Sequence, residues 1–161
     1  MPVTPPPFQR FLDAHRDEVW RFLVAAVGRD AADDCFQETF LAALRAYPRL
    51  RDDSSPRAWV LTIAHRKALD YHRARARRAV PVGDVPDRLA PPDPEPWAGD
   101  ELWARVATLP ARQRAALLLR YAGDLSHAEV ARALGCSEEA ARRSVFEGLK
   151  KLRLELTTCT T

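Results

Sequence analysis

Residues 126–145 decide the fold of this chain, and they read SHAEVARALGCSEEAARRSV. Ser126 followed three positions later by Glu129 is a capping box, which predicts that a short helix starts here. Gly135 then supplies a tight turn, and Ser137 is a suitable cap for a second helix. A short helix, a glycine-containing turn and a second capped helix predict a helix-turn-helix unit.

The second helix of this unit has an inward and an outward face. Apolar spacing predicts an inward stripe of Ala141, Val145, Leu149, Leu152 and Leu156. The opposite face carries charges and one aromatic ring, in Glu139, Arg142, Arg143, Phe146, Glu147 and Lys150. In a helix-turn-helix protein this face enters the DNA major groove, where arginine contacts guanine or phosphate and an aromatic ring contacts a thymine methyl group. The alternatives are a solvated charged face and, for Phe146, packing against a neighbouring domain.

The rest of the chain also shows helical periodicity, and no strand-like alternation persists anywhere. Glycine and proline mark the helix ends. Helices are expected over residues 8–27, ended by Gly28; from Asp30 to Tyr47, ended by Pro48; from Pro56 to about Ala79; from Asp100 to Ala107; and from Ala111 to Ala122, ended by Gly123. We therefore predict an all-α fold.

A proline-rich acidic stretch separates two helical blocks. Residues 81–96 hold six of the 13 prolines, too many for a regular helix or strand. The net charge of +3 divides into +4 for residues 1–80, −5 for residues 81–101 and +4 for residues 102–161. We therefore expect two small helical domains, residues 1–80 and 100–161, joined by a flexible acidic Pro-rich linker over residues 81–99.

Composition excludes several classes of protein. No apolar run approaches the roughly 18 residues of a membrane span, and residues 1–7 do not have the pattern of a secretory signal. Cys35, Cys136 and Cys159 form neither a disulfide framework nor a zinc site, which favours a cytoplasmic location. We find no phosphate-binding glycine loop, nucleophile motif or metal-ligand spacing, so we expect no enzyme activity, cofactor, metal or small-molecule substrate. His65 and His72 are interpreted as surface or groove residues.

Two further faces are candidates for binding. In the second expected helix, a narrow face opposite the core carries Asp34, Gln37, Glu38 and Leu41. Acidic groups repel phosphate, so this face favours a protein partner over plain solvation. In the third expected helix, one stripe beside the polar loop Arg51–Ser55 carries Thr62, Arg66, Leu69 and Arg73. Such a stripe suits a nucleic-acid backbone, and a solvated charge run is an equally good explanation.

Three stretches of the chain resemble the bacterial sigma factors of the extracytoplasmic-function type, group IV of the sigma-70 family. Residues 30–41 are similar to region 2.2 of that family. Residues 56–70, with the arginine-rich run after them, are similar to regions 2.3 and 2.4. Region 4 is matched by residues 109–114, 118–121 and 125–137. Three motifs in this order are far more specific than any one of them.

The resemblance implies a promoter-specificity factor that binds core RNA polymerase and directs transcription initiation at −10 and −35 elements, with no catalysis of its own. The β′ clamp of the polymerase would contact Asp34, Gln37, Glu38 and Leu41. The −10 element would be recognised and melted by Arg51, Asp52, Asp53, Ser54, Ser55, Thr62, Arg66 and Arg73. The −35 element would be contacted by Ser137, Glu139, Arg142, Arg143 and Phe146.

The resemblance also implies two further partners, the β flap of the polymerase and an anti-sigma factor. The alternative function is a helix-turn-helix regulator or adaptor that does not recruit polymerase, and such a protein has no need of the acidic face around Glu38. The chain departs from the family at Arg66, where asparagine is common, and at Glu138 and Glu139, which start the last helix. The promoter sequence is therefore not carried over from the family.

Overall fold

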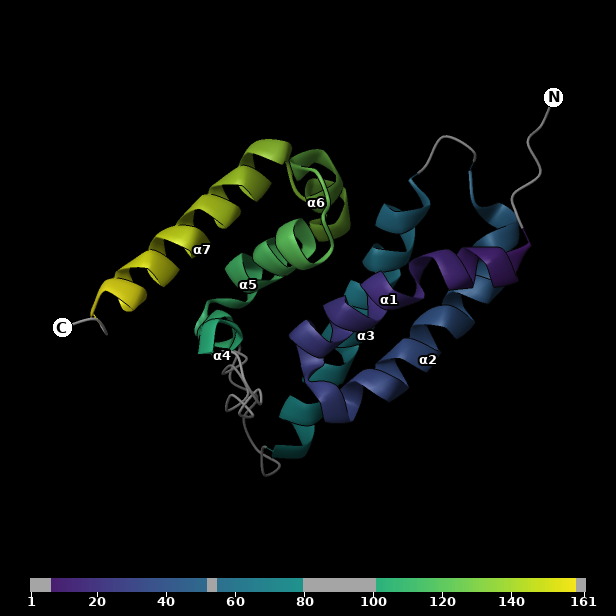
Figure 1. Cartoon of the computed structure of the whole chain (residues 1–161), viewed down its shortest axis with the longest axis horizontal. Helices are drawn as coiled ribbons and strands as arrows, with labels where there is room; N and C mark the ends of the chain where they lie inside the picture. Colours follow the sequence, from purple (N-terminus) through teal and green to yellow (C-terminus); the bar gives the residue numbers. More distant parts are fainter. Residues whose placement is uncertain (1–6, 52–54, 80–100, 159–161) are drawn as a thin grey trace.

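The computed structural model describes residues 7–51, 55–79 and 101–158, and within these ranges every regular element is helical. The N-terminal group consists of α1 (Phe8–Val27), α2 (Arg29–Ala46), the 3-10 turn η1 (Tyr47–Arg49) and α3 (Pro56–Ala79). The C-terminal group consists of α4 (Glu101–Thr108), α5 (Ala111–Leu117), the π turn η2 (Leu118–Ala122), α6 (His127–Leu134) and α7 (Glu138–Thr158). Figure 1 shows the two groups side by side. The predicted all-α fold is confirmed.

Two of the sequence predictions concern residues that lie outside this description. They are the linker at residues 81–99 and the loop residues Asp52, Asp53 and Ser54. The domain boundaries at residues 80 and 100 stay predictions for the same reason.

The N-terminal group is a bundle in which α1, α2 and α3 pack against one another. Gly28 separates α1 from α2 with φ +87, a backbone conformation that glycine adopts without steric cost. At one end of the bundle the ring of Phe11 lies 5.2 Å from that of Tyr47 and 5.6 Å from that of Trp59. These aromatic contacts join all three helices, because Tyr47 directly follows α2, and they anchor the start of α3.

The C-terminal group contains the predicted helix-turn-helix, formed by α6 and α7. The capping box is complete, since the Ser126 hydroxyl accepts from the Glu129 amide at 3.2 Å and the Glu129 carboxylate accepts from the Ser126 amide at 2.8 Å. Gly135 ends α6 in the left-handed region at φ +66. The Ser137 hydroxyl then accepts from the Ala140 amide at 3.1 Å and caps α7. Both α5 and α6 pack on α7.

For the C-terminal group one expectation is wrong, and a second holds except for the register of the helix. Leu156, expected from the apolar stripe to face inward, is 44% exposed, whereas Leu152 one turn earlier is buried; Leu156 lies in the last turn of α7, which ends at Thr158. The helix expected to run from Ala111 to Ala122 is α-helical only to Leu117. It then changes to π register, with the Gly123 amide bonded to the Leu118 carbonyl at 2.9 Å.

The interpretation of His65 as a surface or groove residue is also wrong. The side chain is 7% exposed, in the core of the N-terminal group. Burial, with a smaller contribution from the charge of Arg66, lowers the pKa of His65 to about 4. His72 is partly buried, its Nε2 lies 2.8 Å from the Ala26 carbonyl, and burial is the main cause that lowers its pKa.

We expect the stability of the chain to fall as the pH decreases from about 6.5 to about 4. The unfolded chain binds a proton at His65 with the ordinary pKa of 6.5, whereas the folded chain does so only near 4, so acid favours the unfolded state. The loss attributable to this residue reaches about 3 kcal/mol at the acid end. Urea unfolding at several pH values measures it. His65→Leu should flatten the pH dependence and His127→Gln should not; equal slopes in all three proteins contradict the assignment.

Candidate binding faces

The acidic face of α2 lies on the side of that helix away from the core. Asp34, Gln37 and Glu38 are exposed, and Leu41 is 53% exposed in their midst. The opposite side of the helix is buried against α1 and α3 through Ala32, Cys35, Thr39, Phe40 and Ala43. The four residues predicted from the sequence therefore share one accessible surface.

The negative charges of this face also affect Cys35 on the buried side of α2. The pKa of the Cys35 thiol is raised to about 11, first by burial and then by the negative charges of Glu38 and Asp34. A thiol with this pKa stays protonated at neutral pH and is a core residue without nucleophilic character. Sequence reasoning missed Leu44, which is 49% exposed on the same side and enlarges the apolar part of the face. Its spacing of three from Leu41 is the pattern that identifies it.

The predicted stripe on α3 is present but is not uniformly exposed. Arg66 and Arg73 are exposed, Leu69 is partly buried, and Thr62 is partly buried with its hydroxyl donating to the Ala58 carbonyl at 2.7 Å. The stripe therefore presents two guanidinium groups about 10 Å apart along the helix axis, with apolar and hydroxyl groups beside them.

The loop before α3 is described only at its ends. Arg51 is exposed, and the Ser55 hydroxyl accepts from the Ala58 amide at 3.3 Å. Ser55 therefore acts as a cap for α3. The positions of Asp52, Asp53 and Ser54 lie outside the described residues.

The outward face of α7 is accessible along its first half. Glu139, Arg142 and Arg143 are exposed, and the ring of Phe146 is 64% exposed. The alternative that Phe146 packs against a neighbouring domain is not what the structure shows within the described residues. Ser137 lies at the start of the same helix, where its hydroxyl is already used in capping.

Both arginines of this face are paired with glutamates one turn earlier. Arg142 Nη2 lies 2.7 Å from Glu138 Oε1, and Arg143 Nη2 lies 3.4 Å from Glu139 Oε1. Sequence reasoning did not include Glu138 among the binding residues, although the spacing of four from Arg142 is the spacing of a helical ion pair. In the free chain, each guanidinium that is aimed outward is thus partly neutralised by a carboxylate.

Other kinds of site have no counterpart in the described ranges. Residues 7–51, 55–79 and 101–158 contain no group of three histidine, cysteine, aspartate or glutamate side chains placed to hold a metal ion. A helix with the length and apolarity needed to cross a membrane is also absent from these ranges.

Comparison with known proteins places both helical groups in one family. The Sigma-70 region 2 family matches residues 11–78, and the Sigma-70 region 4 family matches residues 99–152. The chain is 36% identical over 141 residues to a probable RNA polymerase sigma-C factor of Mycobacterium bovis, covering 85% of this chain and 76% of that protein. It is 36% identical over 136 residues to the ECF RNA polymerase sigma factor ShbA of Streptomyces griseus, covering 78% and 71%.

A solved structure supports the fold. The sigma factor RpoE of Bartonella quintana, crystallised in complex with the anti-sigma factor NepR, matches with a TM-score of 0.76. The match covers 93% of this chain and 96% of that one at 21% sequence identity.

A helix-turn-helix group that matches region 4, joined to a three-helix group that matches region 2, defines the class of sigma-70 factors. At 36% identity over most of both chains, the protein belongs to the family of extracytoplasmic-function (ECF) RNA polymerase sigma factors. It is a promoter-specificity factor that directs transcription initiation, and RNA polymerase and promoter DNA are its partners. The alternative of a regulator that does not recruit polymerase is not favoured. Sigma factors are initiation factors without catalytic activity of their own.

Proposed function

We propose that this sigma factor binds polymerase and the two promoter elements through three separate faces, which lie on two domains, residues 1–80 and 100–161. The face of Asp34, Gln37, Glu38 and Leu41 binds the β′ clamp of the polymerase. The observation that carries this assignment is the accessible acidic and apolar surface on α2, where Leu41 and Leu44 are both about half exposed. Exposed leucines among acidic residues suit a protein interface, and they do not suit a phosphate backbone.

The two DNA-binding faces follow from the placement of arginine. Recognition and melting of the −10 element is assigned to α3 and the loop before it, through Arg51, Asp52, Asp53, Ser54, Ser55, Thr62, Arg66 and Arg73. Contact with the −35 element is assigned to α7, through Ser137, Glu139, Arg142, Arg143 and Phe146. The exposure of Arg66, Arg73, Arg142 and Arg143 supports both assignments. Arg66 in place of asparagine is expected to give a −10 preference different from that of relatives with asparagine.

Three further proposals concern the surroundings of the protein. The region 4 domain contacts the β flap of the polymerase, and the chain works in the cytoplasm, where core polymerase is found. An anti-sigma factor controls it, an assignment supported by the sigma factor RpoE of Bartonella quintana, a structural relative that was crystallised with the anti-sigma factor NepR.

Run-off transcription with core RNA polymerase tests the function as a whole. Fragmented genomic DNA is transcribed with and without the chain, and the start sites are mapped. We expect a defined set of new start sites that share two upstream elements. An unchanged transcript set contradicts the proposed activity, and new start sites without shared elements contradict the assignment of two DNA faces.

The ion pairs on α7 lead to a prediction of their own. Glu138→Gln and Glu139→Gln should tighten binding to −35 duplex DNA by about threefold to tenfold, because each frees a guanidinium and removes a charge that repels phosphate. The dependence of affinity on salt concentration should become steeper. Fluorescence anisotropy at several salt concentrations measures both effects, with Glu155→Gln near the end of α7 as the control. Weaker binding instead would show that the carboxylates contact bases favourably, as acceptors from cytosine do.

A further inference from the structure

One acidic residue on the outward face of α7 has no part in the proposed −35 contacts. Glu147 is exposed and lies next to Phe146, one turn after Arg143. Residues four positions apart lie on the same side of a helix, so Glu147 shares the outward face with Arg143. A carboxylate therefore lies among the side chains assigned to the DNA major groove.

The charge of Glu147 is not neutralised within the described part of α7. Arg142 Nη2 lies 2.7 Å from Glu138 Oε1. Arg143 Nη2 lies 3.4 Å from Glu139 Oε1. In both pairs the glutamate precedes the arginine by four residues, which is the favourable order along a helix. Arg143 is thus paired on its N-terminal side, and among the described residues no cation pairs with Glu147.

A neutral amide holds the carboxylate of Glu147 in place. Gln113 Nε2, in α5, donates to Glu147 Oε2 at 3.2 Å. Gln113 Oε1 is buried and accepts no hydrogen bond from the described residues. In the reversed orientation of the amide, this oxygen would face the carboxylate and repel it, so the negative charge of Glu147 explains the orientation. Gln113 restricts the rotation of Glu147 and leaves its charge intact.

Gly148 explains why α5 comes close enough to make this hydrogen bond. A β-carbon at Gly148 would lie 2.9 Å from Leu117 Cδ1 and 3.5 Å from Gln113 Cβ. Any other residue would have to displace the Leu117 side chain. Glycine inside a helix is less stable than alanine, so the close packing of α5 on α7 is the reason for it here.

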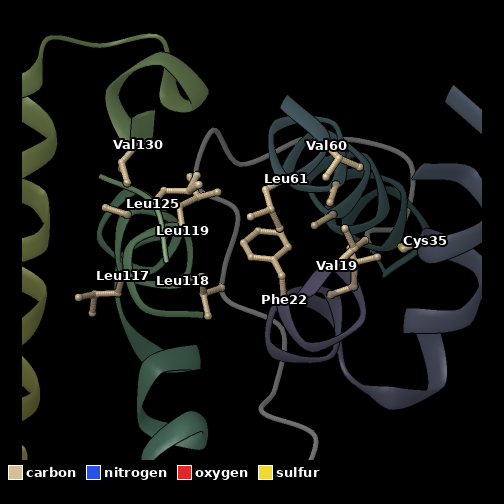
Figure 2. Close-up of a cluster of buried hydrophobic side chains, with 14 of the residues drawn as sticks. Val19, Phe22, Cys35, Val60, Leu61, Leu117, Leu118, Leu119, Leu125 and Val130 are labelled. Atoms are coloured by element: carbon tan, nitrogen blue, oxygen red, sulfur yellow. The ribbon is translucent and has the colours of Figure 1, made fainter. Parts of the chain in front are cut away.

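The packing of α5 directs Gln113 toward α7. Figure 2 shows Leu117 pointing toward α7, whereas Leu118 lies on the side of the N-terminal group, facing Phe22 and Leu61. All four side chains are buried. Gln113 lies one turn before Leu117 and therefore on the same side of α5. The contact between Gln113 and Glu147 is thus supported by a buried leucine beneath it.

A fixed carboxylate in the major groove distinguishes the four bases. A carboxylate only accepts hydrogen bonds. Cytosine presents its N4 amino group as a donor, whereas guanine presents two acceptors and thymine presents one. Adenine has an amino group too, but the acceptor N7 lies beside it. The carboxylate is therefore attracted to cytosine and repelled by guanine and thymine, and repulsion of the wrong bases increases specificity.

We propose that Glu147, positioned by Gln113, is a specificity-determining residue that selects cytosine in the −35 element by accepting a hydrogen bond from its N4 amino group. The inference rests on the proposed placement of α7 in the major groove and names a base that α7 selects there. With α7 lying along the groove, this cytosine is within about two base pairs of the contact made by Arg143, since one helical turn rises about 5.4 Å and one base pair about 3.4 Å.

Transcription by the holoenzyme from a promoter library tests the proposal. The −35 element of a promoter found by run-off mapping is randomised, each template carries a barcode in its transcribed part, and the RNA is sequenced. The unsubstituted factor should favour cytosine at one −35 position by roughly tenfold to a hundredfold. Glu147→Ala should lose the preference at that position alone. Glu147→Gln should shift it toward adenine, which offers an amide both a donor and an acceptor.

The matched control is Glu155→Gln, which removes an exposed carboxylate two turns farther along α7 and should keep the cytosine preference. Gln113→Leu tests the positioning role, because it removes the amide donor and keeps an apolar stem against α7. It should reduce the cytosine preference by about threefold or more and have no further effect in combination with Glu147→Ala. If the pair only supported the fold, Gln113→Leu would lower transcription from every template equally and leave the base preference unchanged.

Three results would overturn the inference. The first is an equal cytosine preference in Glu147→Ala and in the unsubstituted factor. The second is a uniform rise in transcription by Glu147→Gln on every −35 sequence, which would show that Glu147 only repels phosphate. The third is a preference for adenine in the unsubstituted factor that Glu147→Ala removes. Failure of the proposed function looks different: the unsubstituted holoenzyme then shows no preference at any −35 position, and the inference fails with it.

Discussion

Reversal of two charges on α2, in Asp34→Lys/Glu38→Lys, is expected to abolish association with core RNA polymerase and to leave the helical fold intact. Both side chains are exposed on the face opposite the core, so the substitution removes no packing. Lysine is a good helix former, and positions 34 and 38 hold a like-charged pair one turn apart before and after the substitution, so the helix itself changes in stability by only a few tenths of a kcal/mol. At an interface, by contrast, each reversed charge costs about 2–5 kcal/mol when its partner stays buried and unpaired. Two such losses amount to about 4–10 kcal/mol, which weakens the affinity by roughly a thousandfold or more.

Co-purification of core polymerase with tagged sigma factor measures the effect, and competition with a fluorescent unsubstituted factor gives its size. The matched control is Asp13→Lys/Asp17→Lys on α1, which reverses two exposed charges with the same spacing on a different helix. The circular dichroism of both variants should equal that of the unsubstituted chain. If the α2 variant still co-purifies with polymerase, or if the α1 control loses it equally, the assignment of the α2 face is refuted.

The helix ends show why so much of the fold could be predicted. Gly28, Pro48, Pro56 and Gly135 each act through backbone geometry that depends on their own residue type, and each marks an end or a start in the structure. The capping box at Ser126 acts within four residues. Such local effects need no knowledge of the rest of the chain.

The errors have a common physical cause: the helix register and the burial of these residues depend on contacts with residues that are distant in the sequence. The apolar spacing around Leu118 and Leu119 fits a regular α-helix and a π turn equally well. The π turn packs against α1, a contact that the spacing does not reveal. His65 is interpreted from the sequence as a surface or groove residue, yet its side chain is buried. Leu156 continues an apolar stripe into the last turn of α7, where it is 44% exposed.

The contact between the two helical groups was not predictable from the same pattern. Phe22 and Leu61 fit the apolar faces of α1 and α3, and Leu118 fits that of the helix before the turn. Each residue is explained by periodicity within its own group, so nothing in the sequence shows that they meet. The candidate binding faces are easier to predict from the sequence, because the exposed Arg142, Arg143 and Phe146 contrast with the buried apolar stripe on the same helix.

Truncation of the arginines on α7, in Arg142→Ala and Arg143→Ala, is expected to weaken binding to −35 duplex DNA. The expected loss is about 1–3 kcal/mol, or roughly tenfold to a hundredfold, for each arginine that contacts a base with both nitrogens of its guanidinium group. Each variant also leaves its partner glutamate, Glu138 or Glu139, unpaired beside the phosphates. The loss should therefore exceed that of Arg153→Ala, a control that removes an exposed arginine farther along the same helix.

The pattern of loss distinguishes base contact from phosphate contact. If Arg142 contacts a guanine, Arg142→Ala should lose affinity for the preferred duplex and none for a duplex with that base pair replaced, so that specificity at one position relaxes. If it contacts phosphate, binding should weaken equally on every sequence and the slope against log salt concentration should fall by about 1. Arg142→Lys separates the two further, because lysine keeps the charge and loses the paired donors that fit guanine. Anisotropy titrations over a set of duplexes and salt concentrations measure these patterns. Arg142 and Arg143 are the only positively charged residues of α7 before Lys150. Unchanged affinity of both variants for every duplex therefore contradicts the placement of α7 in the major groove.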